Sequence, residues 1–281
     1  MNAPVAGHNR HLADMAHRIR RTALRMGEVQ GQGYIAQALD IADVLAVAYF
    51  HAMRFRPDAP EWEGRDRFLL SNGHYAIALY AALIVAGVIP EDELETYGSD
   101  ESRLPMSGMA SYTPGMEMSG GSLGLGLAIA VGHCLGLKRK GSDARVFTLF
   151  SDGELGEGSV WEAIMSATNY ELDNLIAVVD INDMQADGPS KQATAFEPLR
   201  EKLEAFGWFV QRIDGNDLDA VVAAFDAAMN HSEKKPRMII ADTLMGKGVP
   251  FLEAREKNHF IRVEAHEWKL AIEALDAGRT A

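Results

Sequence analysis

Cysteine is almost absent from this 281-residue chain, which contains only Cys134. No disulfide can therefore form within the chain, as is typical of proteins from a reducing compartment. The sequence also lacks any run of about 20 apolar residues, the length of a membrane-spanning helix. Residues 1–7 have no apolar core of the kind found in signal peptides. We therefore expect a soluble, cytoplasmic protein.

Basic residues are scarce as well. Lys and Arg number 27 against 40 Asp and Glu, which gives a formal net charge of −13. Nucleic acids and anionic membranes are bound by clustered basic side chains, so this balance argues against both as partners. If the substrate is a phosphorylated sugar, the positive charge that holds it must be local or must come from another chain.

The expected secondary structure changes along the chain from mostly helical to alternating. Apolar spacing predicts helices over residues 9–26, 38–50, 75–86, 122–138, 158–170 and 218–229. Buried apolar runs predict strands over residues 67–70, 145–150, 175–181, 206–213 and 238–242. Strands separated by helices predict an α/β fold, in which a parallel sheet is flanked by helices on both faces. No linker or repeat divides the sequence, so we expect a single domain over residues 1–281, with residues 1–8 disordered.

Two polar turns follow neighbouring strands of this predicted sheet. Asp152 and Gly153 follow the strand at 145–150, and Asn182 follows the strand at 175–181. The carboxyl ends of adjacent parallel strands lie at one edge of a sheet, so these side chains are expected close together. Carboxylate, amide and carbonyl oxygens suit Mg²⁺, which usually completes its shell with phosphate oxygens. Either turn alone is also an ordinary turn, so the interpretation depends on other segments.

Five segments, in the same order, resemble the transketolase family. Asp152-Gly153 followed by Asn182 resembles the thiamine-diphosphate motif, usually Gly-Asp-Gly followed by Asn. Residues 66–74, which end in Ser-Asn-Gly-His, are similar to the transketolase segment ending Ser-x-Gly-His. Residues 121–126 are similar to its Gly-Ser/Pro-Leu-Gly-Gln-Gly, and residues 245–248 match its late Gly-Lys-Gly turn. His259 then stands where the family keeps another histidine.

The resemblance implies a thiamine-diphosphate-binding domain of the type that holds the diphosphate (PP-type). It implies that Asp152, Asn182 and the carbonyl group of Met184 hold Mg²⁺. Gly153 would lie at the diphosphate of the cofactor, where a residue without a side chain lets the backbone approach.

Other site residues are also implied by the resemblance. His74 and His259 would lie at the diphosphate as catalytic residues, and the backbone near Gly121 and Leu123 would meet the aminopyrimidine. Glu157 would belong to an acidic network that relays protons between paired sites. A lone histidine such as His259 is more often a surface or helix-edge residue than a ligand contact, and only its place after Gly-Lys-Gly favours function. The alternative for Glu157 is an acid favoured by a helix N-terminus.

Three departures from the family pattern concern the motif and the substrate. Ser151 replaces the first glycine of the diphosphate motif. Tyr34 stands where transketolases have a histidine that meets the donor sugar, and Ser107 replaces the last residue of Ser-Arg-x-Pro-Gly-His. Both missing histidines belong to the substrate side, so thiamine chemistry is retained while the ordinary pentose-phosphate substrates are in question. The methionine-rich loop 98–121 is expected to be functional, either as an apolar lid or by packing under the cofactor.

Complete transketolases resemble this chain only over their first part. The remainder supplies a pyrimidine-binding domain, the glutamate that protonates the cofactor ring and most basic residues that grip the sugar phosphate. We therefore expect one subunit of a two-chain transketolase, inactive alone, that transfers a two-carbon ketol unit from a ketose phosphate to an aldose acceptor. The expected partner is a C-terminal subunit carrying the pyrimidine-binding domain, in a heterotetramer with two copies of each chain.

Two alternatives remain open from the sequence. One is another two-chain thiamine enzyme, either a 2-oxo-acid dehydrogenase or a deoxyxylulose-phosphate-synthase-like protein. The Ser-Asn-Gly-His segment and the Gly-Lys-Gly turn favour the transketolase interpretation. The other alternative is a non-catalytic scaffold subunit, which would not need the metal set of Asp152 and Asn182.

Overall fold

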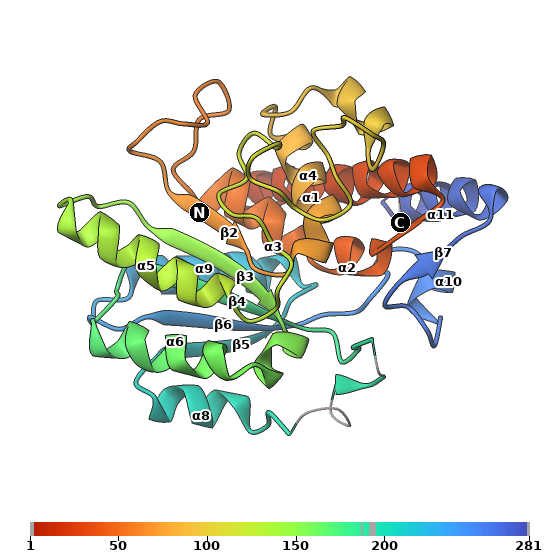
Figure 1. Cartoon of the computed structure of the whole chain (residues 1–281). Coiled ribbons are helices and arrows are strands. Elements are labelled where there is room, and N and C mark those ends of the chain that lie inside the picture. The colour runs from red at the N-terminus through yellow and green to blue at the C-terminus, as the bar shows by residue number, and fades with distance from the viewer. Residues whose placement is uncertain (1–2, 187, 191–194, 280–281) are drawn as a thin grey trace.

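A parallel sheet forms the centre of the molecule. The computed structural model describes residues 3–186, 188–190 and 195–279. Five strands follow the order β2-β3-β4-β6-β5, and every neighbouring pair is parallel. These strands are β2 (Arg67–Leu70), β3 (Val146–Ser151), β4 (Leu175–Ile181), β5 (Phe209–Asp214) and β6 (Arg237–Asp242). The expected parallel α/β fold is confirmed (Figure 1).

Helices cover both faces of the sheet (Figure 1). One layer consists of α1 (Ala3–Gln30), α2 (Ile35–Asp40), α3 (Ala42–Val47), the π-helical turn η1 (Ala48–Ala52), α4 (Ala76–Val85) and α9 (Leu218–Asn230). The other layer consists of α5 (Gly126–Arg139), α6 (Gly158–Asn169) and α8 (Leu199–Ala205). This arrangement buries both faces, as parallel sheets require.

Each layer has its own hydrophobic core. Successive residues of a strand point to opposite faces, so Ile176 and Val178 of β4 pack in one core and Ala177 and Val179 in the other. All residues of β3 and β4 are buried. Burial on both faces explains why these strands are nearly continuous apolar runs in the sequence.

Six short elements and the C-terminal helix α11 complete the described part of the chain. They are β1 (Gln32–Gly33), η2 (Gly73–Tyr75), η3 (Glu91–Thr96), η4 (Asp152–Gly156), α10 (Pro250–Glu253), β7 (Ile261–Arg262) and α11 (Ala265–Gly278). Strands β1 and β7 pair in antiparallel fashion, with Gly33 opposite Ile261. This pairing brings the segment around Tyr34 against the segment around His259, from opposite ends of the sequence.

The described part of the chain begins with α1 at Ala3, and residues 1–2 of the segment expected to be disordered lie outside the described residues. Contacts with other elements hold this end. The ring nitrogens of His8 and His51 lie 2.9 Å apart, and Asn9 donates a 2.6 Å hydrogen bond to Asp219.

A membrane-spanning helix must be both long and apolar. α1 is long, but Arg and His side chains stand between its apolar residues. Within the described part of the chain, no helix is both long and apolar enough to cross a membrane.

Candidate active site

The candidate site lies at the edge of the sheet where β3 and β4 end. In the parallel register of these strands, Ser151 is opposite Asp180. Asp152 directly follows the last residue of β3, and Asn182 directly follows the last residue of β4. The two strands are neighbours, so their ends lie side by side. The structure thus places the two expected metal ligands at the same edge of the sheet.

Asp152 is almost completely buried, with 1% of its surface exposed. Its Oδ2 accepts a 2.5 Å hydrogen bond from the hydroxyl group of Ser190. Burial raises the pKa of Asp152 to about 7, and the nearby carboxylate of Asp180 adds to this effect. The replacement of glycine by Ser151 is accommodated locally, because Ser151 and Glu154 form a capping box at the start of η4.

Asn182 is held in a fixed orientation by polar neighbours. Its side-chain nitrogen donates to the hydroxyl of Tyr75 over 2.8 Å and to the carboxylate of Asp180 over 2.6 Å. Its side-chain oxygen therefore faces the next loop, where it accepts a 3.2 Å hydrogen bond from the backbone of Met184. A carbonyl oxygen has a second lone pair, so this oxygen retains an acceptor position for a metal ion.

Two further carboxyl groups are buried near this edge. Asp180 and Asp40 are fully buried, and among the described residues no side chain or backbone group forms a hydrogen bond with either side-chain oxygen of Asp40. Burial raises the pKa of Asp180 to about 6 and the pKa of Asp40 well above its usual range, the latter with contributions from Asp180 and Asp152. Arg20 acts in the opposite direction, but its guanidinium is bound to Asp43.

A bound divalent cation would compensate these buried carboxyl groups. Asp152, the Asn182 amide and a backbone carbonyl supply hard oxygen ligands of the kind that Mg²⁺ prefers. In the described part of the chain, no three His, Cys, Asp or Glu side chains cluster as a metal site. A site that takes one carboxylate from the protein and further oxygens from a diphosphate agrees with this finding, so the residues present fit Mg²⁺ with thiamine diphosphate.

A cavity of about 250 Å³ opens beside Asp152. It brings together most of the residues expected at the cofactor, namely His74, Leu123, Asp152, Gly153, Glu157, Met184 and His259. Among the described residues that line it there is no Lys or Arg. A bound diphosphate would therefore have to be neutralised by the metal ion, with neutral hydrogen-bond donors around it.

The two histidines of this cavity are neutral near pH 7. Burial lowers the pKa of His74 to about 4, with a smaller contribution from His259, and burial also lowers the pKa of His259. The side-chain nitrogen of Gln37 lies 3.2 Å from Nδ1 of His259. Because an amide nitrogen only donates, Nδ1 must accept, and the ring proton of His259 lies on Nε2.

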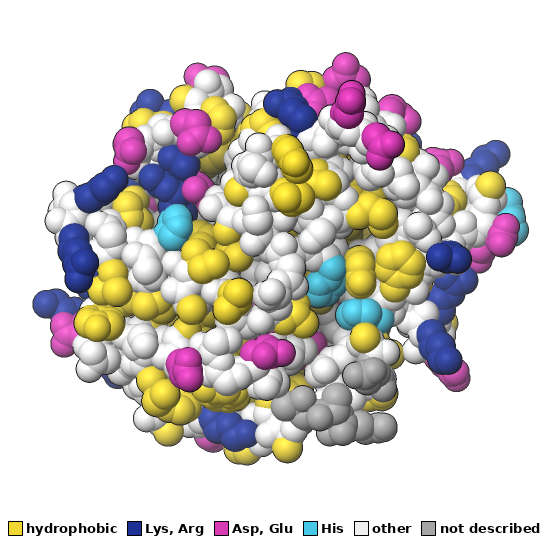
Figure 2. Space-filling model, viewed as in Figure 1, with side chains coloured by type: hydrophobic (Ala, Val, Ile, Leu, Met, Phe, Trp, Pro, Cys, Tyr) yellow, Lys and Arg dark blue, Asp and Glu magenta, His cyan; other side chains and the backbone are white. Residues whose placement is uncertain are grey.

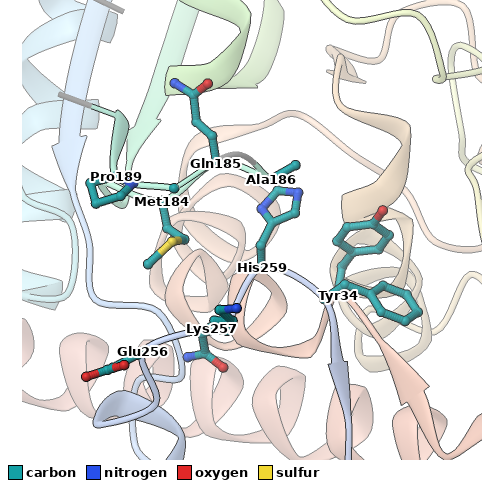
Figure 3. A pocket seen from close by; sticks show the side chains of 11 residues that line it. Tyr34, Met184, Gln185, Ala186, Pro189, Glu256, Lys257 and His259 are labelled. Carbon is teal, nitrogen blue, oxygen red and sulfur yellow. The ribbon is translucent and has the colours of Figure 1, made fainter. Parts of the chain in front are cut away.

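Tyr34 forms an aromatic cluster at the mouth of the site. Its ring centre lies 4.6 Å from that of His74, 5.4 Å from that of His259 and 5.0 Å from that of Phe260. Tyr34 also lines a second cavity, of about 680 Å³, which shares Met184 and His259 with the first (Figure 3). Tyr34 therefore occupies the approach to the two histidines.

Three of the expected residues lie outside both cavities. Asn182 is buried, whereas Gly121 and Ser107 of the methionine-rich loop are exposed. This loop approaches the His74 turn through glycines, since a Cβ added to Gly73 would come within 2.5 Å of the Gly120 backbone. Neither cavity has Ser107 in its wall.

The methionines of this loop have different environments. Met116 and Met118 are buried, each in the core of a different face of the sheet, and Met106 packs against one of these cores. Met109 is partly exposed. Most of this cluster therefore packs into the hydrophobic cores, and none of these four methionines lines either cavity.

Glu154 connects three segments of the site by hydrogen bonds, a role that the sequence analysis did not predict. Its fully buried carboxylate accepts hydrogen bonds from the Ser71 hydroxyl, from Gly124 N over 2.8 Å and from Ser151 N over 3.0 Å. It thus joins the end of β2, the Leu123 turn and the end of β3. The Ser-x-x-Glu spacing of a capping box was the available signal.

Asp180, Gln37 and Gln185 were also missed. Asp180 is the one charged residue in the apolar run of β4, and Gln37 is a fully buried polar residue of α2. A polar residue within an apolar run was the signal for both, since buried polar groups require a partner or a function. Gln185 follows the expected ligand Met184 and lines both cavities.

Comparisons with known proteins agree with this site. Residues 12–277 match the family model described as transketolase, thiamine diphosphate binding domain. The chain is 73% identical over 275 residues to an uncharacterised transketolase family protein of Sinorhizobium fredii, covering 98% of this chain and 99% of that protein. It is 39% identical over 265 residues to a 6-deoxy-6-sulfo-D-fructose transketolase subunit of Clostridium sp., covering 94% and 96% of the two chains.

The fold agrees with solved structures as well. The transketolase of Campylobacter jejuni superposes with a TM-score of 0.84 at 27% identity over 96% of this chain. The match covers 47% of that structure, so the chain spans about half the length of a solved transketolase. The ordered motifs, the parallel sheet and the family match over residues 12–277 lead to one conclusion: this chain belongs to the transketolase family and contains its thiamine diphosphate binding domain.

Proposed function

We propose that this chain is the cofactor-binding subunit of a two-chain transketolase, which transfers a two-carbon ketol unit from a ketose phosphate to an aldose acceptor. The observation that carries the proposal is the buried carboxyl group of Asp152 in one cavity with two neutral histidines. Thiamine diphosphate supplies the electron sink for breaking the carbon–carbon bond. The residues of this chain bind and orient the cofactor and keep water from it.

The proposed metal ligands are Asp152, Asn182 and the carbonyl group of Met184. The register of β3 and β4 and the fixed orientation of the Asn182 amide support this assignment. Gly153 and His259 would face the diphosphate.

The proposed roles of the remaining site residues concern hydrogen bonds and protons. His74 would donate near the diphosphate as a neutral ring, in agreement with its lowered pKa. Leu123 and the backbone near Gly121 would contact the aminopyrimidine. Glu157, exposed at the rim of the cavity beside Gly124, would pass protons toward a second site.

A partner chain is part of the proposal. The Clostridium relative is named a transketolase subunit and has nearly the length of this chain. An apolar surface supports a docking face beside the cofactor cavity, because Leu125, directly before α5, and Ile129 on α5 are 47% and 38% exposed, within six positions of Leu123 in the sequence. Figure 2 shows hydrophobic side chains at the surface of the region where α5 lies in Figure 1. We propose that the chain carrying the pyrimidine-binding domain covers this face, and that two copies of each chain form a heterotetramer in the cytoplasm.

The proposed donor is a modified ketose phosphate rather than xylulose 5-phosphate. Tyr34 is bulkier than histidine and carries a phenol group in place of an imidazole, and it stands at the approach to His74 and His259. Ser107, which is exposed and lies in the wall of neither cavity, is smaller than the histidine that it replaces. A site built for one hydroxyl pattern can reject another by several orders of magnitude, because buried polar groups go unpaired.

The test uses the chain alone and the chain assembled with its partner, which is sought in the neighbouring reading frame. With thiamine diphosphate and Mg²⁺, ketol transfer is expected only from the complex. Activity of the single chain would contradict the need for a partner, and an inactive complex would favour the scaffold alternative. A panel of ketose phosphates then gives kcat/KM values, and a first rank for xylulose 5-phosphate would overturn the donor assignment.

A further inference from the structure

Gln185 contains a buried hydrogen-bond donor without a partner. In the described part of the chain, no group accepts from its side-chain nitrogen, although that atom is shielded from solvent. A buried donor left unpaired is unfavourable, and such groups are uncommon unless a ligand or water satisfies them. The atom is therefore a candidate for contact with a bound molecule.

The position of Gln185 is set by its surroundings. Its backbone is held in a turn, where it donates a 2.8 Å hydrogen bond to Gly188 and accepts one of 3.1 Å in return. In Figure 3 its side chain leaves the chain in the direction opposite to that of Met184. Its amide carbon lies 3.7 Å from where a Cβ of Gly153 would be, so the amide lies over the residue next to Asp152.

The chemistry of the free atom requires a hydrogen-bond acceptor as its partner. An amide nitrogen donates hydrogen bonds and does not coordinate Mg²⁺, whereas oxygen atoms do. Gln185 lines the cavity of Asp152, where no described lining residue is Lys or Arg and where His74 and His259 are neutral. An anion in this cavity must therefore be bound by neutral donors together with the metal ion.

We propose that the side-chain nitrogen of Gln185 donates a hydrogen bond to a diphosphate oxygen of bound thiamine diphosphate. The inference rests on the proposed cofactor site and adds to it a residue outside the family motifs. Gln185 is thus a positioning residue for the diphosphate, directly after the loop that holds the metal ion.

Calorimetry of the full chain, alone and with its partner, tests this role. The probes are Mg²⁺ alone, inorganic pyrophosphate with Mg²⁺, and thiamine diphosphate with Mg²⁺. Gln185→Leu keeps the size of the side chain and removes the donor, and we expect the affinity for both diphosphate probes to fall about ten- to a hundredfold. Gln185→Glu adds a negative charge and should weaken both more strongly, while the affinity for Mg²⁺ alone remains unchanged in Gln185→Leu.

Thermal unfolding distinguishes a role in cofactor binding from a role in the structure of the loop. Without cofactor, the Tm of Gln185→Leu should equal or exceed that of the parent, because an unpaired buried donor is removed. The increase in Tm on adding thiamine diphosphate should shrink. The matched control is Gln211→Leu on β5, whose side-chain nitrogen donates a 2.9 Å hydrogen bond to the carbonyl oxygen of Ala224.

The outcomes separate this inference from the function on which it rests. Diphosphate affinities of Gln185→Leu within twofold of the parent would overturn the role of Gln185 while leaving the cofactor site in place. A loss of Mg²⁺ binding or a large fall in Tm without cofactor would assign Gln185 to the structure of the loop instead. A parent protein that binds neither diphosphate probe would refute the proposed cofactor site itself, and this inference with it.

Discussion

Gln37 and His259 are hydrogen-bonded although 222 positions separate them in the sequence. The amide nitrogen of Gln37 contacts Nδ1 of His259 and also donates a 2.7 Å hydrogen bond to the carbonyl oxygen of that residue. Gln37 is completely buried in the first helix layer. It therefore fixes both the position of the His259 ring and the nitrogen that carries its proton.

Replacing Gln37 by leucine should release the His259 ring. The parent is expected to show the tautomer with its proton on Nε2, and Gln37→Leu a mixture of both tautomers, measured by nitrogen NMR of labelled histidine. The Kd for thiamine diphosphate should rise about tenfold or more, as for other residues that orient a ligand-binding histidine. Gln211→Leu serves as the control. A parent protein with the proton on Nδ1 would refute this account.

The sequence defined the strands better than the site. The runs 67–70 and 175–181 coincide with β2 and β4, because polar turns bound two fully buried apolar runs. α5 begins at Gly126 instead of the expected residue 122, because Glu154 binds the backbone of Gly124 and holds the preceding residues in a turn. That hydrogen bond connects distant segments and has no local signal.

The pairing of β1 with β7 and the contact of Gln37 with His259 also join distant segments, so the sequence could not predict them. β1 and β7 have only two residues each, and their pairing connects opposite ends of the chain. The sequence could predict that Asp152 and Asn182 meet, since both follow adjacent strands, but not that Gln37 contacts His259. α11 is different, because its buried Trp268, Ala271 and Leu275 recur at helical spacing and this signal was overlooked.

Mg²⁺ binding should depend on pH near neutrality. Burial holds the pKa of Asp152 at about 7, so protons compete with the metal ion for its carboxylate. The affinity for Mg²⁺ should therefore fall about tenfold for each pH unit below about 7 and level off above about pH 8. Calorimetric titrations between about pH 6 and about pH 8 measure this dependence. An affinity that is constant over this range would contradict the role of Asp152.

Asp40 should make the metal-free protein less stable as pH rises. Its folded pKa lies above its unfolded value, so above about pH 4 the unfolded chain releases a proton that the folded chain retains. The free energy of unfolding therefore decreases with pH until the folded carboxyl group ionises. Asp40→Asn removes this effect and should be more stable by about 1–3 kcal/mol at alkaline pH, measured by urea unfolding.

The control for this prediction is Asp92→Asn, at an exposed position. It should leave the pH dependence of unfolding as in the parent. If Asp40→Asn is less stable than the parent at every pH, Asp40 has a partner that stabilises its ionised form, and the account of uncompensated buried charge is wrong.

The proposed docking face on α5 can be tested by replacing Gly132, an exposed glycine of this helix, with a large residue. A Cβ added to Gly132 would meet no atom within 4 Å, so Gly132→Leu should fold and gain roughly 0.8–1 kcal/mol in helix propensity. The larger side chain should nevertheless weaken binding of the partner chain about tenfold or more, measured by surface plasmon resonance.

Gly7 in α1 provides a matched control, because its surroundings are equally open. Gly7→Leu should bind the partner as the parent does. Equal affinities for both variants would remove α5 from the interface. A parent chain that forms dimers by itself, which Gly132→Leu disrupts, would assign the face to a second copy of this chain.

The central claim is that Asp152 holds the metal ion through which this chain binds thiamine diphosphate. The direct test is calorimetric titration of thiamine diphosphate, with Mg²⁺ present, into the complex of the parent chain and into that of Asp152→Ala, with Asp58→Ala as an exposed control. Loss of the anionic ligand should abolish Mg²⁺-dependent binding in Asp152→Ala. The circular dichroism spectrum should remain that of the parent, because the site lies on a loop at the end of a strand. An Asp152→Ala complex that binds the cofactor within a few-fold of the parent would contradict the claim.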